Sequence, residues 1–325
     1  MPDLENNSNS ENQDNPNNQP DYHQNRRSIH DVYPLISPIA AAFLGLIGGF
    51  FLYQFVGGLL TLIIFGFDIE SAPVNSLRLM TMAGQLLFML LPALLFAKWI
   101  YGDVAEVISV KIPNWIELTL FSTGIIILTP MLQSYLYVQN YFVEQLAANS
   151  ATINSVKVFF DTMNELVEKT YSNLLKANSI PEVFLVIVVI AAVPAFCEEV
   201  MFRGYIQRSF EFKMKPFWAA IITAIFFGLY HFNPYGLLPL TALGLYFGFA
   251  AYKSKSLVVP MFLHFLNNFA AIMLYFIIGS DELINSEVTD SSGLNANILM
   301  FILLGLLFTI VILIIKKYYS KIKMA

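Results

Sequence analysis

The sequence predicts an all-α, polytopic membrane protein with about eight transmembrane helices and a polar site inside the helix bundle. Hydrophobic residues make up 57% of its 325 positions and charged residues only 13%, and the mean hydropathy is +0.62. A soluble domain is about one quarter charged. Apolar runs of roughly 20 residues, the length that crosses a bilayer, recur along the chain. The net charge of −5 indicates no nucleic-acid partner.

The N-terminal tail, residues 1–32, is expected to be disordered. It is rich in Asn, Gln, Asp and Pro and holds almost no aliphatic side chains. Such a segment cannot bury enough apolar surface to offset the entropy lost on ordering. No signal-peptide core lies near its start. We therefore expect the first apolar segment, which begins near Leu35, to act as an uncleaved membrane anchor.

Eight apolar segments are candidate transmembrane helices, and the fifth and sixth are the shortest. The sequence "HFNPYGLLP" separates these two, which allows a break inside the bilayer. The expected spans are 36–66, 79–100, 115–137, 183–210, 216–232, 237–252, 257–278 and 297–315. After the tail, the chain divides into three regions: 33–182 with the first spans and an outer loop, the membrane core 183–278, and 279–325 with an outer loop, the last span and a basic tail.

The distribution of Lys and Arg predicts the orientation. With the N-terminus inside, 14 of the 18 basic residues fall in cytoplasmic segments. Basic residues are enriched on the cytoplasmic side of membrane proteins. We therefore expect a multi-pass protein of the cell (inner or plasma) membrane with both termini in the cytoplasm.

One outer loop, about residues 138–182, is long and contains apolar residues at helical spacing with charges between them. This pattern favours an amphipathic helix that lies on the membrane surface or over the bundle. A solvated helix packed on its neighbours explains the pattern equally well.

Several polar residues interrupt the apolar runs of the membrane core. Burying a charge in a bilayer costs several kcal/mol on insertion scales, so intramembrane ionisable groups usually mark a functional site. At about 1.5 Å of rise per residue, three of them lie roughly 14 to 22 Å from the cytoplasmic ends of their helices. They therefore fall in one band near the midplane. The full set is Glu198, Glu199, Arg203, His231, His264 and Asn268.

Each of these residues also has an ordinary structural explanation. A lone buried histidine is more often a hydrogen-bonded structural residue than a ligand. Glu199 and Arg203, spaced i and i+4, fit a simple helix ion pair. Chance is a poor explanation for the whole set, because such groups are rare in apolar helices.

Three motifs in this region resemble those of a known family. "EEVMFR" fits E-E-x-x-x-R, "FGLYH" (227–231) fits F-x-x-x-H, and "HFLNN" (264–268) fits H-x-x-x-N. They occur in this order in the CAAX protease and bacteriocin-processing (CPBP or ABI) family of intramembrane endopeptidases, which includes type II CAAX prenyl endopeptidase. The resemblance covers about residues 183–278 and implies that this region is a catalytic membrane core.

The resemblance implies a role for each motif residue. Glu198 would be the general base that activates water, and Glu199 would pair with Arg203. His231 and His264 could bind a divalent metal, zinc above all, with Glu198 as third ligand. They could instead orient the water and polarise the carbonyl, with Asn268 as donor to the oxyanion. No H-E-x-x-H motif is present, so both alternatives stay open.

The neighbouring thiol is a weak candidate nucleophile. Consecutive residues of a helix point about 100° apart, so Cys197 does not face the same way as Glu198. A thiol buried among apolar groups is also poorly reactive.

The resemblance implies hydrolysis of a peptide bond in a membrane-anchored or lipidated (CAAX-like) protein or peptide, with membrane lipid as the other partner. A proton-coupled transporter is an alternative, because intramembrane Glu and His also form proton relays. A non-catalytic bacteriocin-immunity protein on the same fold is a second alternative.

Overall fold

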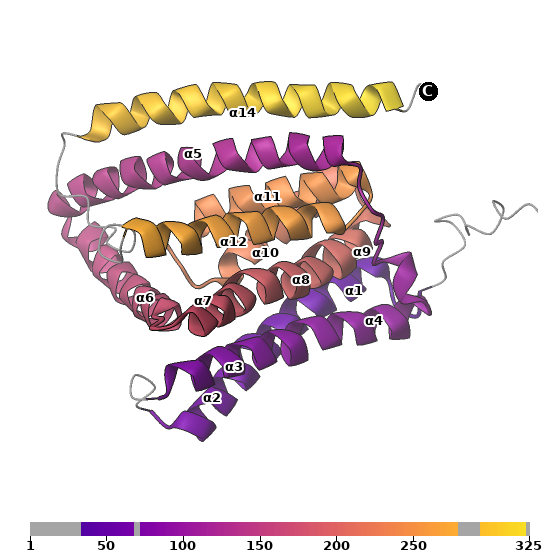
Figure 1. Cartoon of the computed structure of the whole chain (residues 1–325), viewed down its shortest axis with the longest axis horizontal. Coiled ribbons are helices and arrows are strands. Elements are labelled where there is room, and N and C mark those ends of the chain that lie inside the picture. The colour runs from indigo at the N-terminus through magenta and orange to yellow at the C-terminus, as the bar shows by residue number, and fades with distance from the viewer. Residues whose placement is uncertain (1–33, 68–71, 279–292, 323–325) are drawn as a thin grey trace, which may run out of the picture. The chain divides into compact units, whose positions relative to one another are not determined.

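A computed structural model of the chain describes residues 34–67, 72–278 and 293–322 (Figure 1). The predicted disordered tail and most of the loop before the last span lie outside these residues. Residues Pro34–Ala325 form one compact unit. Every regular element in the described part of this unit is a helix, and no strand is present there. The predicted all-α membrane fold is therefore confirmed.

Six of the described helices are long and apolar enough to cross a membrane, and they coincide with six expected spans. Several contain short π-helical stretches between α-helical parts. The spans are Pro38–Phe65 with α1 (Pro38–Phe43) and α2 (Gly57–Phe65), Val74–Tyr101 with α3 (Val74–Gln85) and α4 (Leu91–Tyr101), α5 (Trp115–Ala148), Ile180–Glu211 with α7 (Ile180–Val186), α8 (Val193–Glu199) and α9 (Gln207–Glu211), α12 (Val258–Ile278), and Leu294–Lys321 within α14 (Leu294–Ile322).

The other two expected spans are shorter helices, α10 (Pro216–Tyr230) and α11 (Leu237–Ser254), which pack against each other. At 15 residues, α10 is about 22 Å long, less than the roughly 30 Å of a hydrocarbon core. The turn between the two helices begins at His231, and Phe232 adopts a left-handed backbone conformation with φ 49°. The Asn233 side chain accepts a hydrogen bond from the backbone N–H of Gly236. The expected interruption of this pair is thus a turn within the bundle.

Helix α5 is a long helix of 34 residues. It packs against α14, α11 and α12, and α14 lies alongside it (Figure 1). A capping box between Asn114 and Glu117 begins the helix. It continues past the expected end at residue 137 to Ala148, because helical hydrogen bonding does not stop where the apolar pattern ends.

Helix α6 (Ala151–Leu175) follows directly and corresponds to the expected amphipathic helix. The Ser150 side chain caps its N-terminus by accepting a hydrogen bond from the N–H of Ile153. The helix packs against α5 and α3. These contacts fit both a helix that lies over the bundle and a helix packed on its neighbours.

A close helix crossing gives a first prediction. A Cβ atom on Gly124 of α5 would lie 1.9 Å from the hydroxyl of Tyr246 on α11. That hydroxyl is held in place because it donates to the carbonyl of Phe121. We expect Gly124→Ala to destabilise the protein by about 1–3 kcal/mol, measured as thermal unfolding in detergent, because the ring must move.

Gly58→Ala in α2 is the matched control, since a Cβ there meets no other atom within 4 Å. The control is expected to leave the unfolding midpoint unchanged or slightly raised. Equal midpoints for the two variants would contradict the crossing described above.

Candidate active site

A buried ion pair anchors the fourth span. Arg203 Nη1 donates to Glu199 Oε1 at 2.7 Å, and both side chains are buried. Arg203 Nη2 also donates to the carbonyl of Gly244 at 3.0 Å, and its guanidinium lies 4.4 Å from the centre of the Phe227 ring. These contacts compensate the charge of Glu199 and hold this helix against α10 and α11.

His264 shares the carboxylate of Glu199. Its Nδ1 lies 2.8 Å from Glu199 Oε1, and its ring stacks on Phe247 with centroids 5.2 Å apart. Because the carboxylate oxygen accepts hydrogen bonds, Nδ1 carries the proton in this contact. The other ring nitrogen, Nε2, therefore remains available and lies 4.0 Å from Glu198 Oε2.

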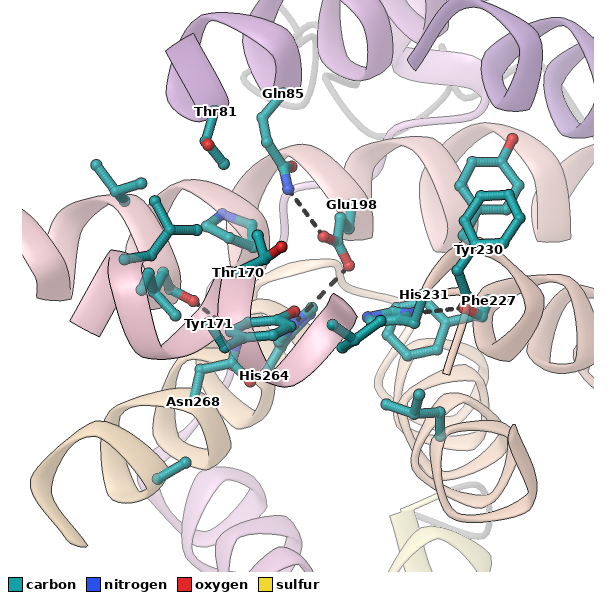
Figure 2. Close-up of a pocket in the computed structure, with 18 of the residues that line it drawn as sticks. Thr81, Gln85, Thr170, Tyr171, Glu198, Phe227, Tyr230, His231, His264 and Asn268 are labelled. Carbon is teal, nitrogen blue, oxygen red and sulfur yellow. Dashed lines mark hydrogen bonds and ion pairs between the residues drawn. The ribbon is translucent and has the colours of Figure 1, made fainter. Parts of the chain in front are cut away.

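Glu198 differs from Glu199 in its surroundings. Within the described residues no Lys or Arg pairs with it, and its Oε1 accepts a hydrogen bond from Gln85 Nε2 at 3.0 Å. Oε2 is buried and has no hydrogen-bond partner in the part of the chain that the structure describes. Figure 2 shows the Glu198 carboxylate between Gln85 and His264. One of its oxygens is thus held in place and the other is free to bind a further group.

His231 follows the last residue of α10. Its Nδ1 lies 2.7 Å from the carbonyl oxygen of Phe227, one turn earlier. A carbonyl only accepts, so Nδ1 is again the donor and Nε2 is left free. Both histidines therefore have the orientation that acid–base and metal-binding histidines share.

Asn268 lies one turn after His264 on α12, and its Nδ2 donates to the carbonyl of Ile190 at 3.0 Å. This carbonyl lies four residues before Pro194, which has no N–H to donate to it. Asn268 thus supplies the hydrogen bond that the proline removes and connects α12 to the fourth span. An amide carries two N–H groups, so a second donor remains on the same atom.

These groups surround a cavity of about 520 Å³ (Figure 2). Glu198, His231, His264 and Asn268 line it, whereas Glu199 and Arg203 do not. Most other lining residues are apolar. The first, second and fourth spans, α6, α10, α11 and α12 all contribute to the wall.

Helix α6 covers this cavity and is held at its C-terminal end and in its N-terminal half. Leu166, Thr170 and Tyr171 line the cavity. At the C-terminal end, the buried Arg78 of α3 donates to the carbonyl of Leu174 at 3.0 Å and to that of Lys176. Cations near a helix C-terminus are favourable because they interact with its unpaired carbonyls.

The N-terminal half of α6 is held through Asp161. Its Oδ2 lies 2.9 Å from Lys157 Nζ, and its Oδ1 accepts a hydrogen bond from Tyr235 at 2.6 Å. Tyr235 belongs to the turn that carries His231. Burial raises the pKa of Asp161, but the hydrogen bonds from Tyr235 and Lys157 outweigh it, so that the pKa is lowered. The interactions of the Asp161 carboxylate with Lys157 and Tyr235 are therefore present at neutral pH. They are lost as the pH falls through the lowered pKa of Asp161.

Four of the expected residues line one cavity, and Glu199 and Arg203 lie behind it. Gln85 also belongs to this site and was not predicted from the sequence. Gln85 lies in the second span, 113 positions before the carboxylate that it binds. The available signal was a lone amide in the apolar run "MTMAGQLLFML". A single amide in an apolar run does not indicate that Gln85 binds Glu198, which lies far away in the sequence.

The described residues do not assemble a complete metal site. No group of three His, Cys, Asp or Glu side chains lies close enough together, within residues 34–67, 72–278 and 293–322, to hold a metal ion. His231, His264 and Glu198 have suitable free atoms but do not converge on one point.

Comparisons with known proteins support the predicted family resemblance. Residues 180–270 match the family model of type II CAAX prenyl endopeptidase Rce1-like proteins, which confirms the predicted resemblance for the segment that carries all three motifs. Among curated proteins, the Bacillus subtilis (strain 168) protein named "Putative membrane peptidase YdiL" is 36% identical over 107 residues. This alignment covers 33% of the chain and 43% of that relative, less than half of its length. No solved structure matches the chain.

Proposed function

We propose that the protein is an intramembrane endopeptidase that hydrolyses a peptide bond in a membrane-anchored or lipidated (CAAX-like) protein or peptide. One observation carries the proposal: the unpartnered Glu198 Oε2 lies 4.0 Å from His264 Nε2 on the wall of a cavity inside an apolar helix bundle. The family match over the same residues supports it. A site at this place is reached most easily by a substrate that is itself held in the membrane.

Glu198 is the general base of the proposed reaction. A water can bind both Glu198 Oε2 and His264 Nε2, because 4.0 Å is less than twice a hydrogen-bond length of about 2.8 Å. Glu198 takes one proton from this water, and the resulting hydroxide attacks the carbonyl carbon of the peptide bond. His264 orients the water: because its Nδ1–H donates to Glu199, its Nε2 lone pair accepts a hydrogen bond from the second O–H of the water, which stays on the attacking hydroxide.

The developing oxyanion needs hydrogen-bond donors. The second N–H of Asn268 is one, and His231 donates from Nε2 when its ring is protonated. The proton on Glu198 then passes to the amide nitrogen as the C–N bond breaks. The products are a carboxylic acid and an amine. Glu199 and Arg203 take no direct part and hold His264 and the fourth span in place.

The proposed orientation places both termini in the cytoplasm, on the basis of the Lys and Arg distribution. Helix α6 then lies on the outer side of the bundle.

The proposal is tested with purified protein in detergent and a mixed library of lipidated and transmembrane peptides. The wild type is expected to release fragments, and His231→Ala and His264→Ala are expected to release far fewer. Wild-type protein that cleaves nothing but takes up a solute with protons in liposomes would favour the transporter. Neither activity would favour the non-catalytic immunity protein.

Metal dependence is tested by chelation. We expect cleavage to persist after treatment with EDTA or 1,10-phenanthroline, because the described donors do not converge as three ligands. Rates before and after chelation measure this directly. Loss of activity that added zinc restores would show instead that His231, His264 and Glu198 close around a metal.

A further inference from the structure

Gln85 is a polar residue of the site that lies outside the matched family segment. It is on the second span, where Thr81, Gln85 and Met89 recur every fourth residue and all line the cavity. This spacing places them on one helix face. The hydroxyl of Thr81 donates to the carbonyl of Leu77, whereas Gln85 Oε1 is a buried acceptor without a partner among the described residues.

The two ends of the Gln85 amide have different surroundings. Nε2 donates to Glu198 Oε1 at 3.0 Å and lies 3.5 Å from the hydroxyl of Tyr53. The orientation of the amide follows from this contact, because a carboxylate oxygen accepts hydrogen bonds and an amide oxygen cannot donate one. Oε1 is buried and has no hydrogen-bond partner in the described segments.

A buried acceptor without a donor is costly, since the group has lost its water and gained nothing in return. Only 4% of Gln85 is exposed. Two such oxygens, Gln85 Oε1 and Glu198 Oε2, belong to hydrogen-bonded neighbours on the wall of one cavity (Figure 2). In the proposed reaction a water binds Glu198 Oε2, so Gln85 Oε1 is the oxygen that still lacks a partner.

We propose that Gln85 Oε1 accepts a hydrogen bond from a backbone N–H of the substrate beside the scissile bond, while Nε2 holds Glu198 in position. This inference rests on the proposed function for the identity of the substrate as a peptide. Each backbone amide of an extended peptide offers one N–H whatever its side chain. Gln85 therefore contributes to binding and register of the peptide without selecting a residue type.

The test is a double-mutant cycle on binding, which needs no turnover. In the Glu198→Gln protein, where the new amide oxygen still accepts from Gln85, the affinity of a transmembrane substrate peptide is compared with versions that each carry one backbone N-methyl group. One N-methyl position is expected to weaken binding about tenfold, because the buried acceptor is left unpaired. After Gln85→Leu, the same N-methyl group is expected to have no further effect.

The inference would be overturned if each N-methyl group weakened binding equally with and without Gln85. It would also be overturned if the protein bound none of the peptides. Gln133→Leu on α5 is the matched control, since Gln133 is exposed and does not line the cavity. Gln85→Met repeats the test if the leucine variant does not fold. Cleavage is measured separately: a wild type that binds peptides with this pattern but cleaves none would contradict the proposed function alone.

Discussion

Glu198→Gln is expected to lower kcat/KM for peptide cleavage by about a hundredfold to ten-thousandfold, the range that loss of a general base produces. The thermal unfolding midpoint is expected to stay the same or rise. The substitution removes a buried carboxylate that no cation compensates, while the new amide oxygen can still accept from Gln85. The measurements are kcat/KM on one cleaved peptide and the midpoint in detergent.

Glu199→Gln is the informative comparison because the two carboxylates are adjacent in sequence. Glu199 is bound by Arg203 and by His264, so its neutralisation leaves a buried guanidinium uncompensated. We expect a clear drop in unfolding midpoint for this variant. Comparable losses of activity and equal midpoints for both variants would contradict the division of roles between base and anchor.

Arg203→Met is expected to destabilise the protein by about 3–5 kcal/mol, the usual cost of removing one partner of a buried pair. Both side chains are fully buried, and the guanidinium also holds the carbonyl of Gly244. Methionine preserves much of the apolar stem and removes only the charge and the donors. Denaturation in detergent measures the change.

A double variant separates charge from packing. With Glu199→Gln added to Arg203→Met, the uncompensated carboxylate is gone, and part of the lost stability is expected to return. Arg208→Met serves as the control, because its pair with Glu211 is partly exposed and exposed pairs contribute at most about 1 kcal/mol. A similar loss for Arg203→Met and Arg208→Met would show that the buried pair has no special role.

Much of the fold could be predicted from the sequence because the signals are local. A run of apolar residues must cross the bilayer or be buried, and that requirement placed six long helices where the structure has them. The interruption between α10 and α11 was visible in Asn233, Pro234 and Gly236, whose backbone preferences favour turns. The extension of α5 to Ala148 was missed, since helix continuation does not require an apolar pattern.

The candidate site was only partly predictable. Its ionisable residues stood out because charges are rare in apolar helices. The resemblance, and not the spacing, implied that Glu198 is the base and that Glu199 pairs with Arg203. The two carboxylates have different partners in the structure: Glu199 binds Arg203, and Glu198 binds Gln85. Asn268 was expected to face the reaction, yet one of its N–H groups completes the backbone near Pro194.

By itself, the sequence determined the membrane class of the protein, the positions of its apolar helices and the motifs that mark the site. These depend on composition and on spacing within single helices. Only the tertiary structure decided that α6 covers the cavity, that Gln85 reaches Glu198 across 113 positions, and that His264 shares the carboxylate of Glu199. Such contacts depend on how each helix is rotated and packed against its neighbours, and no local pattern specifies that rotation.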